Sequence, residues 1–102
     1  MPDVPAYSVY LVRCGDGSLY TGIATDVERR LREHKESARG AKFLRGKGPL
    51  TLVYQQEIGD RSLATRIEAR IKRLPRDVKA DLQRLSTTIE ALRSELAGLN
   101  TG

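Results

Sequence analysis

Hydrophobic and polar residues near the start of the chain follow the pattern of a β-hairpin. Residues 7–13 are rich in β-branched and aromatic side chains, which favours a strand. The next four residues, Cys14-Gly15-Asp16-Gly17, have turn chemistry, because an Asp-Gly pair adopts a positive φ at little cost. Residues 18–24 have strand character again, so we expect the two segments to pair as a hairpin.

A helical period replaces the strand pattern after the hairpin. Thr25 and Glu28 have the Thr-x-x-Glu form of a capping box, which predicts a helix start at this point. The helix is expected to run over residues 26–36. Its side chains at spacings of i, i+4 and i+7 share one face, which is typical of a helix that packs on a core. These are Val27, Leu31 and His34.

The middle of the chain contains a loop, a third strand and a second helix. Residues 40–49 are basic and glycine-rich, and we predict a loop there with at most one short helical turn. Residues 50–57 have strand character and are ended by Gly59-Asp60. A helix is predicted over residues 62–74, because its apolar residues recur at helical spacing. These are Leu63, Ile67, Ile71 and Leu74.

After Pro75, a third helix is predicted to run through the C-terminal part of the chain. Its apolar residues are spaced by four and three in alternation, like the seam of a coiled coil. We expect this seam to fold back onto the domain. The alternative is a homodimer formed through the C-terminal helix, although so few heptads are marginal for a coiled coil. The seam residues are Val78, Leu82, Leu85, Ile89, Leu92 and Leu96.

The order β-β-α-β-α-α predicts a mixed α/β (α+β) fold. Its centre would be a small three-stranded, mainly antiparallel sheet flanked by helices. The chain has 102 residues, which suits one globular unit, since two separate cores would each be too small to offset chain entropy.

Positive charge is concentrated in the middle of the chain. The net charge is +5, and eight basic residues lie between positions 29 and 47, opposed only by Glu33 and Glu36. Two interpretations are open, namely ordinary solvated helix faces or a surface for the phosphate backbone of a nucleic acid. A membrane surface is disfavoured, because no basic amphipathic helix carries bulky aromatic residues.

Composition also excludes several classes of protein. The single cysteine excludes an intrachain disulfide framework and a cysteine-rich zinc site. The longest aliphatic or aromatic run, residues 9–12, is too short to cross a bilayer. The first residues lack the basic and apolar regions of a signal peptide, so we expect a cytoplasmic protein.

Five residues are candidates for chemistry, although each alone has an ordinary structural explanation. Tyr10 and Tyr20 lie ten residues apart on the two predicted hairpin strands, where tyrosines usually pack. Arg30 and His34 lie one helical turn apart and share a helix face. Glu68 lies within the second helix and could pair with a lysine one turn further on.

Taken together, these residues resemble the GIY-YIG nuclease superfamily. Two tripeptides ten residues apart, Ser8-Val9-Tyr10 and Tyr20-Thr21-Gly22, resemble the two that give the family its name; the first is Ser-Val-Tyr and the second has Thr21 in place of Ile, but both keep the tyrosine. The likeness covers residues 7–85, and the whole chain is similar to the small, stand-alone, single-domain proteins of this kind in bacteria. Four further residues follow in the family's order and spacing, namely Asp26, Arg30, His34 and Glu68.

The resemblance implies hydrolysis of DNA phosphodiester bonds with Mg²⁺ or Mn²⁺. Glu68 matches the metal ligand, a role that suits a carboxylate on a rigid helix. Arg30 matches the arginine that neutralises charge on the phosphoryl oxygens. Tyr20 matches the tyrosine that acts on the attacking water, and Tyr10 would orient the site by hydrogen bonding. His34 matches a position that relays a proton or contacts phosphate.

One departure from the family pattern concerns catalysis. Many family nucleases carry an asparagine twelve residues after Glu68, whereas this chain has Ala80, with Lys79 beside it as a candidate substitute. Basic residues of the loop and helices would contact the phosphate backbone, which positions a substrate without reading its sequence. The predicted contacts are Arg29, Lys42, Arg45, Lys47, Lys72 and Lys79.

The sequence therefore predicts a nuclease-like domain over residues 1–85 and a C-terminal helical extension and tail over residues 86–102. The predicted activity is that of a DNA endonuclease of low sequence specificity. A preference for branched, nicked or damaged DNA and a role in DNA repair or processing stay open. Two alternatives are a nucleic-acid-binding module with little or no catalysis, which Ala80 would favour, and an accessory subunit that docks through its C-terminal helix.

Overall fold

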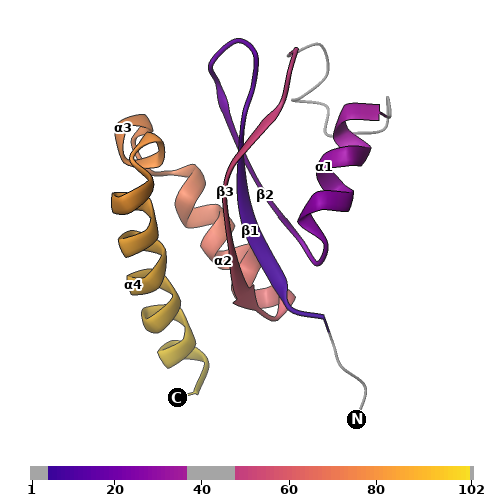
Figure 1. Cartoon of the computed structure of the whole chain (residues 1–102). Helices are drawn as coiled ribbons and strands as arrows, with labels where there is room; N and C mark the ends of the chain where they lie inside the picture. The colour runs from indigo at the N-terminus through magenta and orange to yellow at the C-terminus, as the bar shows by residue number, and fades with distance from the viewer. Residues whose placement is uncertain (1–4, 37–47, 102) are drawn as a thin grey trace.

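A three-stranded sheet forms the centre of the fold. The computed structural model describes residues 5–36 and 48–101 (Figure 1). Strand β1 (Tyr7–Arg13) lies between β2 (Leu19–Ala24) and β3 (Thr51–Gly59). Both neighbours run antiparallel to β1. The predicted α/β (α+β) class with an antiparallel sheet is therefore confirmed.

The helices flank this sheet. Helix α1 follows β2, and the other helices of the described chain follow β3, in the predicted order. Figure 1 shows the sheet between α1 on one side and α4 on the other, with α2 passing behind it. None of these helices combines the length and the hydropathy that a membrane-spanning segment needs. The bounds are α1 (Val27–Glu36), α2 (Arg61–Lys72), α3 (Arg76–Ala80) and α4 (Leu82–Thr101).

The central strand β1 supplies side chains to two separate cores, because successive residues of a strand point to opposite faces. Val9 and Leu11 are fully buried on the face covered by α2 and α4. Tyr10 and Val12 are equally buried on the face covered by α1. The first core also contains Ile58, Ala64, Ile67, Ile71, Leu85, Ile89 and Leu96. The second also contains Cys14, Ala24, Val27 and Leu50, with Tyr20, Leu31 and Leu52 partly buried beside them.

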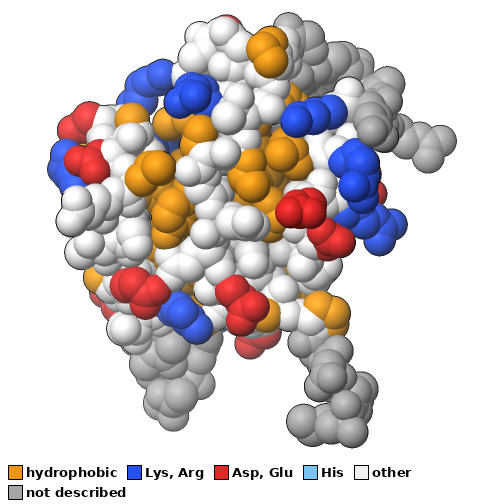
Figure 2. All heavy atoms as spheres, in the orientation of Figure 1, with side chains coloured by type: hydrophobic (Ala, Val, Ile, Leu, Met, Phe, Trp, Pro, Cys, Tyr) orange, Lys and Arg blue, Asp and Glu red, His pale blue; other side chains and the backbone are white. Residues whose placement is uncertain are grey.

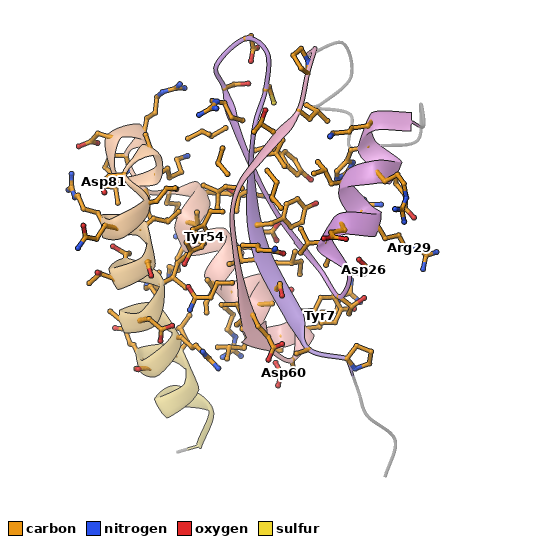
Figure 3. The ribbon with its side chains drawn as sticks, viewed as in Figure 1. Tyr7, Asp26, Arg29, Tyr54, Asp60 and Asp81 are labelled. Atoms are coloured by element: carbon orange, nitrogen blue, oxygen red, sulfur yellow. The ribbon has the colours of Figure 1, made fainter. Side chains whose placement is uncertain are left out.

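Aspartate residues start three of the helices (Figure 3). Asp26 Oδ1 accepts a hydrogen bond from the Arg29 backbone N–H at 3.0 Å, so α1 is capped by Asp26 and the predicted capping box of Thr25 and Glu28 is wrong. Asp60 Oδ1 caps α2 in the same way, at 2.8 Å from the Leu63 nitrogen. A carboxylate satisfies an otherwise unpaired N–H and carries a charge that the helix N-terminus favours.

The predicted C-terminal helix is divided in two at Asp81. This residue has extended backbone angles, φ −93° and ψ 100°, and its carboxylate accepts hydrogen bonds from the backbone N–H groups of Gln83 and Arg84. Short acidic side chains compete with the helical backbone for its own hydrogen bonds, which explains the break. Leu82 therefore lies at the start of α4 with 44% of its surface exposed, instead of continuing the apolar seam.

Three other seam residues pack on the chain's own core, whereas Val78 and Leu92 are only half-buried. Leu85 and Ile89 are fully buried, and Leu96 is 4% exposed, in the cluster that contains residues of β1 and α2. The expectation that the seam folds back onto the domain is therefore confirmed. A homodimer through this helix is not supported, since Leu85, Ile89 and Leu96 of the seam are already covered by the chain's own core. Helix α4 runs without a break through residues 85 and 86, the predicted boundary between the nuclease-like domain and the C-terminal extension.

Candidate active site

Three aromatic side chains from two strands and one helix meet on the face of the sheet that α1 covers. Tyr10 Oη and His34 Nε2 lie 3.1 Å apart and share a buried hydrogen bond. The ring of Tyr20 lies 6.3 Å from that of Tyr10 and 5.8 Å from that of His34, centroid to centroid. The hairpin register causes this meeting, because Tyr10 pairs with Gly22 and so lies diagonally opposite Tyr20 on one face.

Gly22 makes the position of the Tyr10 ring possible. A Cβ atom built on Gly22 would lie 2.6 Å from Tyr10 Oη and 2.7 Å from Cζ, distances far below ordinary contact. The phenol ring therefore lies directly across the glycine on its way to His34. The last residue of the tripeptide Tyr20-Thr21-Gly22 is thus needed for space, a reason that only the tertiary contact reveals.

Burial controls the protonation of the Tyr10 and His34 pair. Desolvation raises the pKa of Tyr10 to about 12, and the neighbouring Tyr20 adds to the rise. Burial and the positive charge of Arg30 lower the pKa of His34. At neutral pH the phenol therefore keeps its proton and the imidazole is neutral, so either group can donate the shared hydrogen, according to the imidazole tautomer.

Arg30 is held at the edge of this cluster by Glu33. Its Nη1 donates to Glu33 Oε1 at 3.1 Å, and this hydrogen bond raises the pKa of the guanidinium, which stays charged. The same carboxylate lies 3.4 Å from Nε of Arg29. Arg30 and Tyr10 influence each other electrostatically, which places the charge of Arg30 close to the phenol. Glu33 was missed as a site residue, although its i+3 spacing from Arg30 was a usable signal.

Glu68 approaches the cluster from α2. Its side chain is 19% exposed, and its negative charge contributes to the raised pKa of Tyr10. Its Oε2 lies 3.4 Å from Nζ of Lys72, the predicted i, i+4 pair. Within the described residues no cluster of three or more His, Cys, Asp or Glu side chains could hold a metal. One partly buried carboxylate fits a hard cation such as Mg²⁺, which keeps several waters and binds substrate phosphate. It does not fit an ion enclosed by protein ligands alone.

A pocket of about 320 Å³ joins the tyrosine cluster to two lysines. Leu19, Tyr20 and Thr21 of β2 line it together with Lys72 and Lys79. Strand β2 is an outer strand of the sheet formed by the described residues. Two cationic side chains therefore line the same pocket as Tyr20.

The residues predicted to contact the phosphate backbone of DNA lie in different parts of the structure. Lys72 and Lys79 lie at the pocket beside Tyr20, as described above. Arg29 points away from the sheet (Figure 3), and its side chain is 70% exposed. Ala80 ends α3 and is exposed. The three predicted contacts of the loop, Lys42, Arg45 and Lys47, lie outside the described residues.

Known proteins are similar in sequence to this chain over most of its length. The UPF0213 protein YhbQ of Salmonella arizonae is 54% identical over 93 residues, which are 91% of this chain and 89% of the relative. The YhbQ protein of Escherichia coli is 57% identical over 74 residues, covering 72% of this chain and 73% of that one. The solution structure of protein EF2693 from E. faecalis matches with a TM-score of 0.57 and 38% identity, over 86% of this chain and 91% of that one.

The family model of the GIY-YIG catalytic domain matches residues 6–81. That span begins just before β1 and includes both tyrosines, α1 with Arg30 and His34, and α2 with Glu68. The tripeptides, the fold and the match over most of the chain agree with one another, and the chain accordingly belongs to the GIY-YIG catalytic domain family.

Proposed function

We propose that this protein is a divalent-metal-dependent endonuclease that hydrolyses DNA phosphodiester bonds with low sequence specificity. One observation carries the proposal. The phenol of Tyr10 shares a hydrogen bond with His34, its ring lies 6.3 Å from that of Tyr20, and the charges of Arg30 and Glu68 both act on its pKa. Side chains from a second strand and two helices therefore contact, bond to or act electrostatically on one phenol, and all five residues have chemistry that suits phosphodiester hydrolysis.

In this reaction a water molecule attacks phosphorus, the bond to the leaving oxygen breaks, and that oxygen takes up a proton. Arg30 binds the phosphoryl oxygens through its planar guanidinium, after the phosphate has replaced Glu33 as its partner. Tyr20 orients the attacking water. Neutral His34 accepts the proton that the attacking water loses, because burial and Arg30 lower its pKa and keep the imidazole unprotonated near pH 7.

Glu68 would hold the metal on α2, after exchanging its ion pair with Lys72 for the cation. A divalent cation bound there supplies charge to polarise the scissile phosphate and to stabilise the leaving oxygen. Lys72 and Lys79 neutralise neighbouring phosphates from the pocket beside Tyr20, and Lys79 takes the place of the asparagine that many family nucleases carry at position 80. Contacts of this kind carry little sequence information, which is the basis for expecting low specificity.

The test is a cleavage assay on plasmid, single-stranded, nicked and branched DNA with Mg²⁺, Mn²⁺ or EDTA. We expect metal-dependent cutting by the wild type and a loss of about a hundredfold in Tyr20→Phe, the cost of misplacing a reacting group by about 1 Å. Tyr54→Phe is the matched control, since Tyr54 is a partly buried tyrosine that bonds to Gln56 on β3, outside the tyrosine cluster. Cutting that persists unchanged in folded Tyr20→Phe would contradict the assigned role.

The second candidate is a nucleic-acid-binding module with little catalysis, which Ala80 favours. The same assay distinguishes it, because DNA binding that weakens with salt, without cleavage under any metal, supports binding alone. Restoring cleavage by Ala80→Asn would then assign the deficiency to this position.

A further inference from the structure

A second pocket lies on the other side of the β2 edge from the tyrosine cluster. It encloses about 230 Å³ and shares Leu19 and Lys79 with the pocket that contains Tyr20. Leu19 pairs with Arg13 across the hairpin, so the second pocket is at the turn end of β1 and β2, under α3. The two pockets therefore adjoin at Leu19 and Lys79. The second pocket is lined by Arg13, Gly17, Leu19, Val53, Arg76, Lys79, Ala80 and Leu82.

The floor of the second pocket is apolar and accessible. Leu19, Val53 and Leu82 provide aliphatic surface. Among the described residues, Leu82 is a large hydrophobic side chain that is exposed, with 44% of its surface accessible. It is exposed because Asp81 breaks the helix and starts α4 at this point. Exposed aliphatic surface within a hollow is typical of a binding site rather than of ordinary protein surface.

The rim of this pocket is cationic. Arg13, Arg76 and Lys79 line it, and none of its described lining residues is acidic. Arg76 is held in place, because its Nη2 donates to the backbone carbonyl of Gly17 in the hairpin turn. Figure 2 shows basic and hydrophobic side chains side by side where α3 approaches the hairpin. An apolar floor under a basic rim is complementary to a flat, apolar base carried on a phosphate backbone.

We propose that this pocket receives one unstacked nucleobase of the DNA strand whose phosphate lies at Tyr20. The proposal rests on the function proposed above and adds the class of substrate, namely DNA in which a nucleotide beside the scissile phosphate is free to leave the base stack. Lys79 lies at both pockets and binds the phosphate between them, while Arg13 and Arg76 bind the phosphate beyond. The base contacts Leu19, Val53 and Leu82 through its faces, a contact that tolerates any base.

The experiment measures binding in EDTA, so that cleavage plays no part. The probes are a fluorescein-labelled short thymidine oligonucleotide and an abasic deoxyribose-phosphate oligomer with the same number of phosphates. We expect the wild type to bind the thymidine probe about five- to tenfold more tightly. This is the lower part of the range for base contacts, since the pocket is aliphatic rather than aromatic.

Leu82→Asp is the test variant, because it places a carboxylate on the pocket floor at a position where the first turn of a helix tolerates an acid. Thr87→Asp adds the same charge to an exposed position of α4 outside this pocket. We expect Leu82→Asp to bring the ratio of the two affinities close to one, and Thr87→Asp to leave the ratio as in the wild type. A ratio near one in the wild type, or an unchanged ratio in Leu82→Asp, would overturn the proposal.

Arg76→Gln gives an independent readout of the rim. Loss of one phosphate contact should reduce the slope of log affinity against log salt by about 0.7, without changing the preference for bases. An unchanged slope would remove Arg76 from the site.

Failure of the base pocket is distinguishable from failure of the nuclease proposal, because a wild type that cuts DNA but binds both probes equally contradicts only the pocket. Equally, preference for the thymidine probe without cleavage contradicts only the nuclease.

Discussion

Replacing Gly22 with alanine should disturb both the fold and the site, because the added methyl group enters the space of the Tyr10 ring. The new Cβ would lie 2.6 Å from Oη, 2.7 Å from Cζ and 3.0 Å from Cε1 of Tyr10. These distances fall short of ordinary contact, which begins at 3.4 Å, by several tenths of an ångström. Tyr10 is only 1% exposed and packs in the core with Val12 and Val27, so its ring cannot move away freely.

The expected cost follows from overpacking of a filled core, which is about 1–3 kcal/mol. Alanine also lowers the entropy of the unfolded chain, which offsets about 0.4–1 kcal/mol. A net loss of about 1–2 kcal/mol corresponds to a decrease in Tm of roughly 5–15 °C in a domain of this size. Displacement of the phenol also stretches its 3.1 Å hydrogen bond to His34. A misplacement near 1 Å in a catalytic site costs about a hundredfold in rate.

Thermal unfolding followed by circular dichroism measures the first effect, and the cleavage rate at a temperature where the variant is folded measures the second. Gly15→Ala is the matched control, since Gly15 is exposed in the hairpin turn and lacks a positive φ. Its Tm should stay close to that of the wild type. If Gly22→Ala has the same Tm as the wild type and the control, the reasoning from the close approach of Tyr10 is refuted.

Four other substitutions test the fold and the protonation of the site. Asp60→Ala removes the cap of α2 and should lower the free energy of unfolding, measured with urea, by about 1 kcal/mol. An unchanged free energy of unfolding would show that the 2.8 Å hydrogen bond from Leu63 to Asp60 does not stabilise the fold. Ile89→Ala should cost about 2–5 kcal/mol because this side chain is fully buried, whereas Leu82→Ala should cost less than about 1 kcal/mol; equal losses would contradict the split of the C-terminal seam. The lowered pKa of His34 means that the unfolded chain binds more protons on acidification, so wild-type stability should fall as the pH drops from about 7 to about 5.5. His34 is the single histidine of the chain, so His34→Gln should flatten this slope, and a slope that persists would assign it to other groups.

The sequence predicts the fold well because its local patterns agree with its tertiary contacts. The strand pattern and the Asp-Gly turn determine the hairpin, and the period of two then places Tyr10 and Tyr20 on one face. Val27 and His34 are buried on the side of α1 that the helical period predicts. The resemblance to the GIY-YIG family, confirmed by the match over residues 6–81, adds Arg30 and Glu68 to this set.

The features that the sequence did not predict depend on competition between local interactions or on contacts distant in sequence. The division of the last helix depends on Asp81, whose carboxylate binds backbone N–H groups that a continuous helix would use itself. The need for Gly22 arises only when the Tyr10 ring crosses it. The pocket that joins Tyr20 to Lys79 requires the docking of α3 beside β2, which periodicity alone does not specify.

The most direct test of the proposed nuclease is the relaxation of supercoiled plasmid by purified wild type, Glu68→Gln and Glu95→Gln. Glu95 is a matched control, because it is an exposed glutamate of α4 that pairs with Arg70 at 3.9 Å, outside the site. We predict nicking by the wild type and by Glu95→Gln in Mg²⁺ or Mn²⁺, no nicking in EDTA, and at least about a hundredfold loss in Glu68→Gln with unchanged circular dichroism. Nicking by Glu68→Gln at the wild-type rate, or nicking that persists in EDTA, would contradict the assignment of Glu68 and with it the proposed metal-dependent mechanism.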